Sequence, residues 1–165
     1  MTEHDKFMKA ALKLAQKSAE EGEVPVGAVV VCDGKIVGRG RNRRELKKNA
    51  LCHAELEAIH KACRKLGGWR LHRCDLYVTL EPCPMCAGAI INARINTVIF
   101  GATDPKAGSC GTIINLFSLP YNHQPEVISG VLEESCREIL RSFFQELREK
   151  RKIQKKQKGN YNAET

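Results

Sequence analysis

Apolar and polar residues follow a helical period in the first part of the chain. Between Thr2 and Glu21 the apolar positions fall on one face and four lysines on the other, which is typical of an amphipathic helix with a solvated side. Thr2 followed by Asp5 is a capping pattern, and Gly22 marks the end of the element. The pattern therefore predicts a helix from Thr2 to Glu21.

Three further stretches carry apolar residues at helical spacing. The predicted helices cover His53–Leu66, Pro84–Asn92 and a segment from about Leu132 into the C-terminal tail. The first of these ends at two consecutive glycines, and the second begins with a proline, which the first turn of a helix tolerates.

Short apolar runs rich in β-branched residues separate the helices. They predict strands over Val26–Cys32, Lys35–Arg41, Leu76–Leu80 and Thr97–Ala102. Asp33-Gly34 between the first two runs is a strong hairpin signal. Residues Arg43–Asn49 and Asp104–Gln124 are expected as loops. Helices that alternate with strands predict an α/β fold in which helices cover a mixed sheet.

Length and composition indicate one domain. The chain has 165 residues, 42% of them hydrophobic, and a net charge of +8. We expect a single domain over residues 1–148 and a basic C-terminal tail over residues 149–165, whose order or disorder the sequence leaves open. The longest apolar runs are too short to cross a bilayer, and no charged-then-apolar leader opens the chain. We therefore expect a cytoplasmic protein without a membrane partner.

One pair of the eight cysteines has the spacing of metal ligands. In a chain without a leader, metal ligation or burial as free thiols is favoured over a disulfide framework. Cys83 and Cys86 form a Cys-x-x-Cys pair, and His53 stands thirty residues before Cys83. One imidazole and two thiolates leave the fourth tetrahedral position of Zn²⁺ open for water, as in catalytic zinc sites. The pattern predicts one zinc ion held by His53, Cys83 and Cys86.

Glu55 is the candidate proton carrier beside that metal. His53 and Glu55 are separated by about 200° around an ideal helix, so they converge only in a first turn, at the helix end. Cys83 and Cys86 likewise suit the N-terminus of their own helix, where the positive dipole end favours thiolates. A carboxylate next to activated water takes up and returns protons, whereas a fourth protein ligand would displace the water.

Two functions without catalysis by zinc are alternatives to this catalytic site. A redox pair at Cys83 and Cys86 leaves His53 and Glu55 unexplained. A zinc-stabilised RNA-binding module without catalysis needs neither an open coordination position nor Glu55.

His-x-Glu followed by Pro-Cys-x-x-Cys is the known signature of the zinc deaminases of nucleobases. The chain carries it as His53-Ala54-Glu55 and Pro82-Cys83-Pro84-Met85-Cys86. From about Phe7 to Phe144 it resembles the family of bacterial tRNA-specific adenosine deaminases. The other segments that carry the resemblance are Val24-Pro25-Val26-Gly27-Ala28, Asn42-Arg43, Thr79-Leu80-Glu81, Gly101-Ala102-x-Asp104, Asn122-His123 and Phe143-Phe144.

This resemblance implies a cytidine-deaminase-like three-layer α/β/α sandwich with a central mixed sheet, so that residues 1–148 form a zinc deaminase domain. It implies a homodimer with one Zn²⁺ per subunit and hydrolytic deamination of the wobble adenosine of a tRNA anticodon loop to inosine, with release of ammonia. It also implies a set of substrate-binding residues, namely Asn42, the backbone of Ala54, Asp104, His123, Phe143 and Phe144. A deaminase of free cytidine, guanine or a nucleotide uses the same metal chemistry and stays an open alternative.

Basic residues gather in two segments. Arg39–Lys48 holds six basic residues and one acid, and Arg148–Lys158 holds seven and one. Such patches are typical of nucleic-acid binders, which favours a tRNA anticodon stem-loop as the partner. A solvated helix face or a solubilising tail remains the alternative. Because aromatic residues make up only 5% of the chain, base stacking would depend on Phe143, Phe144 and Tyr121.

Overall fold

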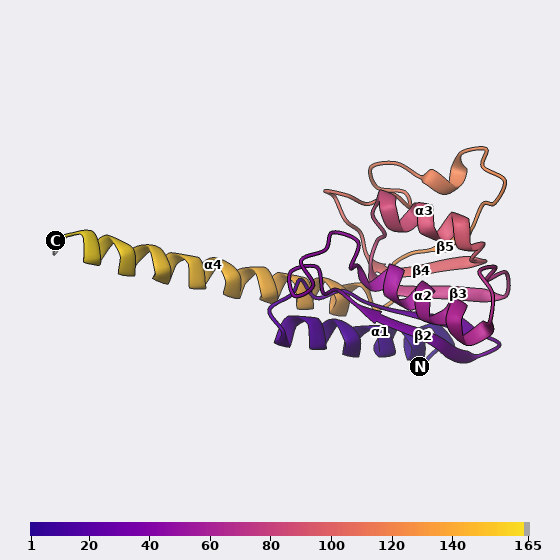
Figure 1. Cartoon of the computed structure of the whole chain (residues 1–165), viewed down its shortest axis with the longest axis horizontal. Coiled ribbons are helices and arrows are strands. Elements are labelled where there is room, and N and C mark those ends of the chain that lie inside the picture. The colour runs from indigo at the N-terminus through magenta and orange to yellow at the C-terminus, as the bar shows by residue number, and fades with distance from the viewer. Residues whose placement is uncertain (164–165) are drawn as a thin grey trace.

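A five-stranded sheet between two layers of helices forms the body of the molecule in the computed structural model, which describes residues 1–163 (Figure 1). The helices are α1 (Glu3–Glu20), α2 (Ala54–Leu66), α3 (Pro84–Ala93), the short 3₁₀ helix η1 (Leu116–Ser118) and α4 (Glu133–Ala163). The strands are β1 (Gly27–Cys32), β2 (Lys35–Arg41), β3 (Cys74–Leu80), β4 (Thr97–Ala102) and β5 (Glu126–Ile128).

The sheet is mixed and runs in the order β2-β1-β3-β4-β5. β1 pairs antiparallel with β2 and β3, whereas β3, β4 and β5 are parallel to one another. Alternate side chains of the buried strand β1 point to opposite faces. Val29 packs with α1 and the start of α4, and Val30 packs with α2 and α3. The expected three-layer α/β/α sandwich is confirmed.

Glycines allow α2 to lie close against β2. A Cβ atom added at Gly40 would lie 2.0 Å from the carbonyl oxygen of Ala54, and one at Gly38 would lie 2.1 Å from that of Ala58. Larger residues at these positions would push the helix away from the sheet. The close approach therefore fixes where the first turn of α2 lies.

The hairpin between β1 and β2 has the turn that its sequence predicts. Asp33 has φ 49° and Gly34 has φ 72°, which places both central residues in the left-handed region that a type I′ turn requires. The predicted helices and strands are otherwise present with ends shifted by a few residues. β5 and η1 are additions to the prediction, and η1 lies inside the segment expected as a loop.

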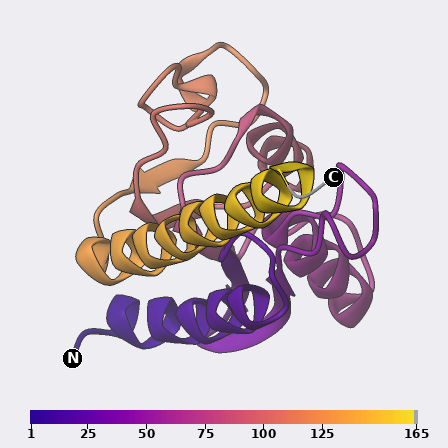
Figure 2. The same cartoon turned by 90° about the vertical axis from the view of Figure 1, so that its left-hand side faces the viewer.

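Helix α4 has two parts with different surroundings. Its first half packs on the sheet beside α1, and Cys136 is fully buried there. From Arg148 to Ala163 every residue is exposed, and this distal part extends away from the body (Figures 1 and 2). The basic tail expected over residues 149–165 is therefore helical as far as residue 163, and residues 164 and 165 lie outside the described part of the chain. Within residues 1–163, no helix combines the length and the apolar character needed to cross a bilayer.

Candidate metal centre and active site

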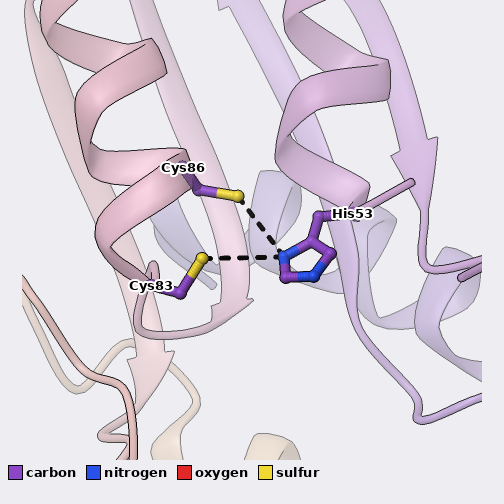
Figure 3. Close-up of side chains that lie close together, drawn as sticks. All are labelled: His53, Cys83 and Cys86. Atoms are coloured by element: carbon purple, nitrogen blue, oxygen red, sulfur yellow. Dashed lines mark hydrogen bonds between the residues drawn. The ribbon is translucent and has the colours of Figure 1, made fainter. Parts of the chain in front are cut away.

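The starts of two helices bring three ligand side chains together. His53 is the N-cap residue of α2, Cys83 is the N-cap residue of α3, and Cys86 lies in the first turn of α3. Nδ1 of His53 lies 3.7 Å from Sγ of Cys83 and 3.5 Å from Sγ of Cys86 (Figure 3). All three ligand atoms lie within 4.8 Å of one another. This is the end-on arrangement that the sequence spacing requires.

The chemistry of these three side chains fits a zinc ion. The hydrogen bond from the Cys86 thiol, helped by the one with His53, lowers the pKa of Cys83 to about 4. The same bond raises the pKa of Cys86, and a hydrogen bond with Cys83 raises the pKa of His53. A lowered pKa favours the thiolate form of Cys83, which is the form that binds a metal ion. Soft thiolates with one imidazole are ligands that Zn²⁺ prefers.

Glu55 lies beside the ligands in the first turn of α2. It is only 4% exposed, and burial raises its pKa to about 7. The ionised forms of His53 and Cys83 act on it in opposite directions, because the first lowers and the second raises its pKa. A carboxyl group that changes protonation near neutral pH is suited to general acid–base catalysis.

A cavity of about 530 Å³ opens in front of this cluster. His53, Glu55 and Cys83 line the cavity together with Leu140 and Phe144 of α4. This volume lies within the usual range for small-molecule sites, which runs from about 300 to about 1,000 Å³. A group bound in the cavity would meet His53, Cys83 and Glu55 together, whereas Cys86 is fully buried and lies outside the lining.

Buried carboxylates hold the two loops that frame the cavity. Glu23 accepts hydrogen bonds from the backbone N–H groups of Glu45 (3.3 Å) and Leu46 (2.6 Å), and it is 1% exposed. These contacts fix the basic loop that follows β2.

Glu81, which is 2% exposed, holds the second loop. It accepts from the backbone N–H groups of Asp104 (3.2 Å), Cys110 (3.1 Å) and Thr112 (3.1 Å) and from the Thr112 hydroxyl. Glu81 therefore orients the backbone of the 104–112 loop.

Four of the six expected substrate-binding residues line the cavity: Asn42, Ala54, Asp104 and Phe144. The Asn42 amide donates to the Val24 carbonyl (3.1 Å) and accepts from the Arg44 N–H (3.2 Å), which leaves one N–H and one lone pair for a ligand.

The other two expected residues lie outside the cavity lining. The ring of Phe143 packs edge-on against that of Phe144, with centroids 5.4 Å apart. His123 lies 2.6 Å from the carbonyl oxygen of Ile95, which precedes β4 and is therefore at the end of the sheet opposite the metal ligands. A role for His123 in substrate binding stays a prediction.

The basic segment Arg39–Lys48 serves two purposes. Arg41 pairs with Glu21 at 2.8 Å, and Arg43 pairs with Glu57, so these two cations are neutralised within the protein. Arg44 instead lines the cavity, together with Lys106 of the opposite loop. Sequence patterning did not single out Lys106 or Leu140, because neither belongs to a segment that carries the family resemblance.

The chain is similar to several deaminases over most of its length. A model of the MafB19-like deaminase family matches residues 2–148. The tRNA-specific adenosine deaminase of Bacillus subtilis (strain 168) is 52% identical over 157 residues, which make up 94% of this chain and 98% of that protein.

Two solved structures extend the comparison. One, from work on A-to-I editing by tRNA:A34 deaminases at the wobble position of transfer RNA, has 46% identity and a TM-score of 0.79, and covers 82% of this chain and 99% of the other. A guanine deaminase from Bacillus subtilis has 36% identity and a TM-score of 0.60, and covers 76% of this chain and 83% of the other. The fold is thus one that deaminases with different named substrates share.

Proposed function

The chain belongs to the family of tRNA-specific adenosine deaminases, and we propose that it converts the wobble adenosine of a transfer RNA anticodon loop to inosine. It is an enzyme that deaminates adenosine. One observation supports this reaction in this chain. His53, Cys83 and Cys86 cluster beside the buried Glu55, at a cavity of about 530 Å³.

We propose that His53, Cys83 and Cys86 hold one zinc ion per subunit. When bound, the ion would act as a Lewis acid and make water nucleophilic at neutral pH. Three protein ligands would leave room for a water on such an ion, and the N-termini of α2 and α3 would stabilise the ionised sulfurs.

Glu55 moves the protons in this proposal. It takes one proton from the attacking water and passes it to a ring nitrogen of adenine. It later takes the second proton from the same oxygen and passes it to the departing amino group. The bond between the ring carbon and the amino nitrogen breaks, a bond from that carbon to the water oxygen forms, and ammonia leaves. Burial keeps Glu55 away from bulk water, which limits the loss of its proton to solvent.

The cavity wall orients the base. The remaining hydrogen-bonding capacity of the Asn42 amide faces the adenine ring, as does the backbone of Ala54, whose N–H belongs to the unpaired first turn of α2. Asp104 and Phe144 contact the flanking nucleotides. An adenosine in an unpaired loop costs little to turn out of its stack, so no duplex-opening element is required.

We further propose that the enzyme is a cytoplasmic homodimer in which His123 contacts RNA. The position of His123 at the far end of the sheet favours a contact with RNA bound outside its own subunit's cavity. A single 18.4 kDa species in sedimentation at native salt would contradict the dimer.

The test of the reaction is mass spectrometry of nucleosides after incubation of the zinc-loaded enzyme with an anticodon stem-loop that carries the wobble adenosine. Free adenosine, cytidine and guanine are assayed in parallel. We expect inosine from the stem-loop alone. Glu55→Gln is expected to lower turnover by at least about 100-fold, because the proton carrier is lost, while its zinc content stays that of the wild type.

Glu45→Gln is the matched control, since Glu45 is exposed and lies outside the cavity lining. Turnover by Glu55→Gln above a few per cent of wild type would refute its role. Guanine or cytidine as the preferred substrate would instead favour a free-base or nucleoside deaminase, the activity named for one structural neighbour.

A further inference from the structure

Basic residues on the exposed part of α4 continue the face of the helix that lines the cavity. An ideal helix turns by about 100° per residue, so Phe144, Arg148, Arg151, Lys155 and Lys158 fall within an arc of about 80°. Phe144 lines the cavity, and the four cations follow it outward along the helix. We call Arg148, Arg151, Lys155 and Lys158 the basic stripe.

The basic stripe has no structural task within the described chain. All four side chains are exposed, and among residues 1–163 none of them pairs with a carboxylate, since the ion pairs of α4 end at Arg141. Arg151 and Lys155 are like charges four residues apart, which destabilises a helix. Their presence is therefore explained better by a polyanionic partner than by the stability of α4.

The length of the basic stripe excludes the nucleotide in the cavity as that partner. Helical rise places Lys158 about 21 Å along the axis from Phe144, and Arg151 about 10 Å from it. Only a ligand that continues outward from the cavity reaches both residues.

We propose that the basic stripe binds the phosphate backbone of the same RNA whose adenosine occupies the cavity, beyond the nucleotides next to that adenosine. The inference rests on the proposed function and adds a second contact region to it. Phosphate contacts of this kind position an RNA without reading its sequence. A membrane surface fits less well, because a helix that binds lipid presents a broad apolar face, whereas the distal part of α4 has only Ile153 and Tyr161 as large apolar residues.

Two variants of the full chain distinguish the effect of where these charges lie from the effect of how many there are. The neutral variant carries Arg151→Gln, Lys155→Gln and Lys158→Gln. The relocated variant carries the same three changes together with Ile153→Lys, Gln157→Lys and Asn160→Lys, which restore the net charge at least about 140° away from the centre of the stripe. Glutamine, lysine and arginine have similar helix propensities, so circular dichroism is expected to show unchanged helix content.

With zinc-loaded enzyme and an anticodon stem-loop, we expect both variants to raise KM about tenfold without changing kcat. The dependence of log K on log[salt] should become shallower by about 2, because each lost phosphate contact removes about 0.7 from the slope for single strands. A trinucleotide with a central adenosine is too short to reach the three altered positions. Its inhibition constant should therefore be equal in the wild type and both variants.

An unchanged KM and salt slope in the neutral variant would overturn the inference. Wild-type affinity in the relocated variant would overturn it too, because net charge rather than the stripe would then suffice. Lost binding to vesicles of anionic lipid with unaltered RNA kinetics would assign the stripe to a membrane surface instead. A different result, no inosine formed by the wild type on the stem-loop, would refute the proposed function itself.

Discussion

Three buried carboxylates lie at the cavity or hold a loop that frames it, and the proposed function assigns proton transfer to only one of them, Glu55. Glu23, Glu81 and Glu55 are 1%, 2% and 4% exposed, so burial does not separate their roles. Their hydrogen-bond partners do separate these roles. Backbone N–H groups occupy the oxygens of Glu23 and Glu81, whereas Glu55 lies among the metal ligands at a helix start. A carboxylate whose two oxygens both accept backbone hydrogen bonds fixes the loop that donates them.

Replacing Glu81 with glutamine tests this assignment. Glutamine keeps one acceptor oxygen but turns the other position into a donor, which then faces an N–H group of the 104–112 loop. We expect Glu81→Gln to lower the free energy of unfolding by about 2 kcal/mol and to raise KM, since the loop carries Asp104. Urea denaturation and steady-state kinetics measure both. Glu126→Gln, at an exposed position of β5, is the control, and equal stability of the two variants would contradict the assignment.

At the scale of elements, the active site depends on how closely α2 approaches the sheet. His53 and Glu55 belong to the start of α2, and the glycines of β2 leave room for that helix directly above the strand. The ligands of α3 come from another βα connection, after β3. The distance between the two helix starts, and hence the geometry of the metal site, is set by packing on adjoining parts of one sheet.

Gly40→Ala should disturb this geometry. Its Cβ would lie 2.0 Å from the Ala54 carbonyl oxygen, so the first turn of α2 must shift. We expect a loss of about 1 to 3 kcal/mol in unfolding free energy and a lower kcat, because His53 and Glu55 move with the helix. Gly68→Ala is the matched control, since a Cβ there meets no atom within 4 Å. If thermal denaturation and kcat were the same for both variants, close packing would not position the site.

The pattern of apolar and polar residues predicted the helices and strands that bury a regular face. It missed β5, which is a strand only because its backbone pairs with a neighbouring strand. The strand Thr97–Ala102 is buried throughout, and its apolar run predicted it with the same ends. β5 has three residues with an exposed, half-buried, exposed pattern, so it carries no such signal, and its strand character comes from pairing with β4.

The candidate site divides in the same way. The spacing of His53, Cys83 and Cys86 predicted their cluster, because two helix starts suffice to form it. The basic segment Arg39–Lys48 predicted a single patch, whereas Arg41 and Arg43 pair with glutamates at positions 21 and 57. Such long-range partners depend on the packing of α1 and α2 against the sheet, which no local pattern contains.

At the scale of the whole molecule, charge and packing are distributed unevenly. Residues 149–165 contain six basic and two acidic residues, so this tenth of the chain carries half of the net charge of +8. From Arg148 to Ala163 the helix makes no buried contact. Its packed first half provides the helical nucleus, and lysine, arginine and glutamine extend it at little cost.

A chain that ends after Arg148 should therefore fold like the full chain. We expect its melting temperature to lie within about 2 °C of the full-length value, since no buried surface is lost. Differential scanning calorimetry at matched zinc loading measures this. A drop of about 10 °C would mean that the distal part of α4 stabilises the domain through contacts with another subunit.

Because α4 runs without interruption from Glu133 to Ala163, the cavity wall and the basic stripe are fixed in phase with each other. Inserting one residue between Phe144 and Arg148 would rotate everything beyond it by about 100°, whereas inserting seven would restore the phase to within about 20°. The part of α4 that lines the cavity and the basic stripe therefore face the same way only at particular lengths of the helix between them. Related enzymes that use both regions should vary in length here by nearly whole numbers of helical turns.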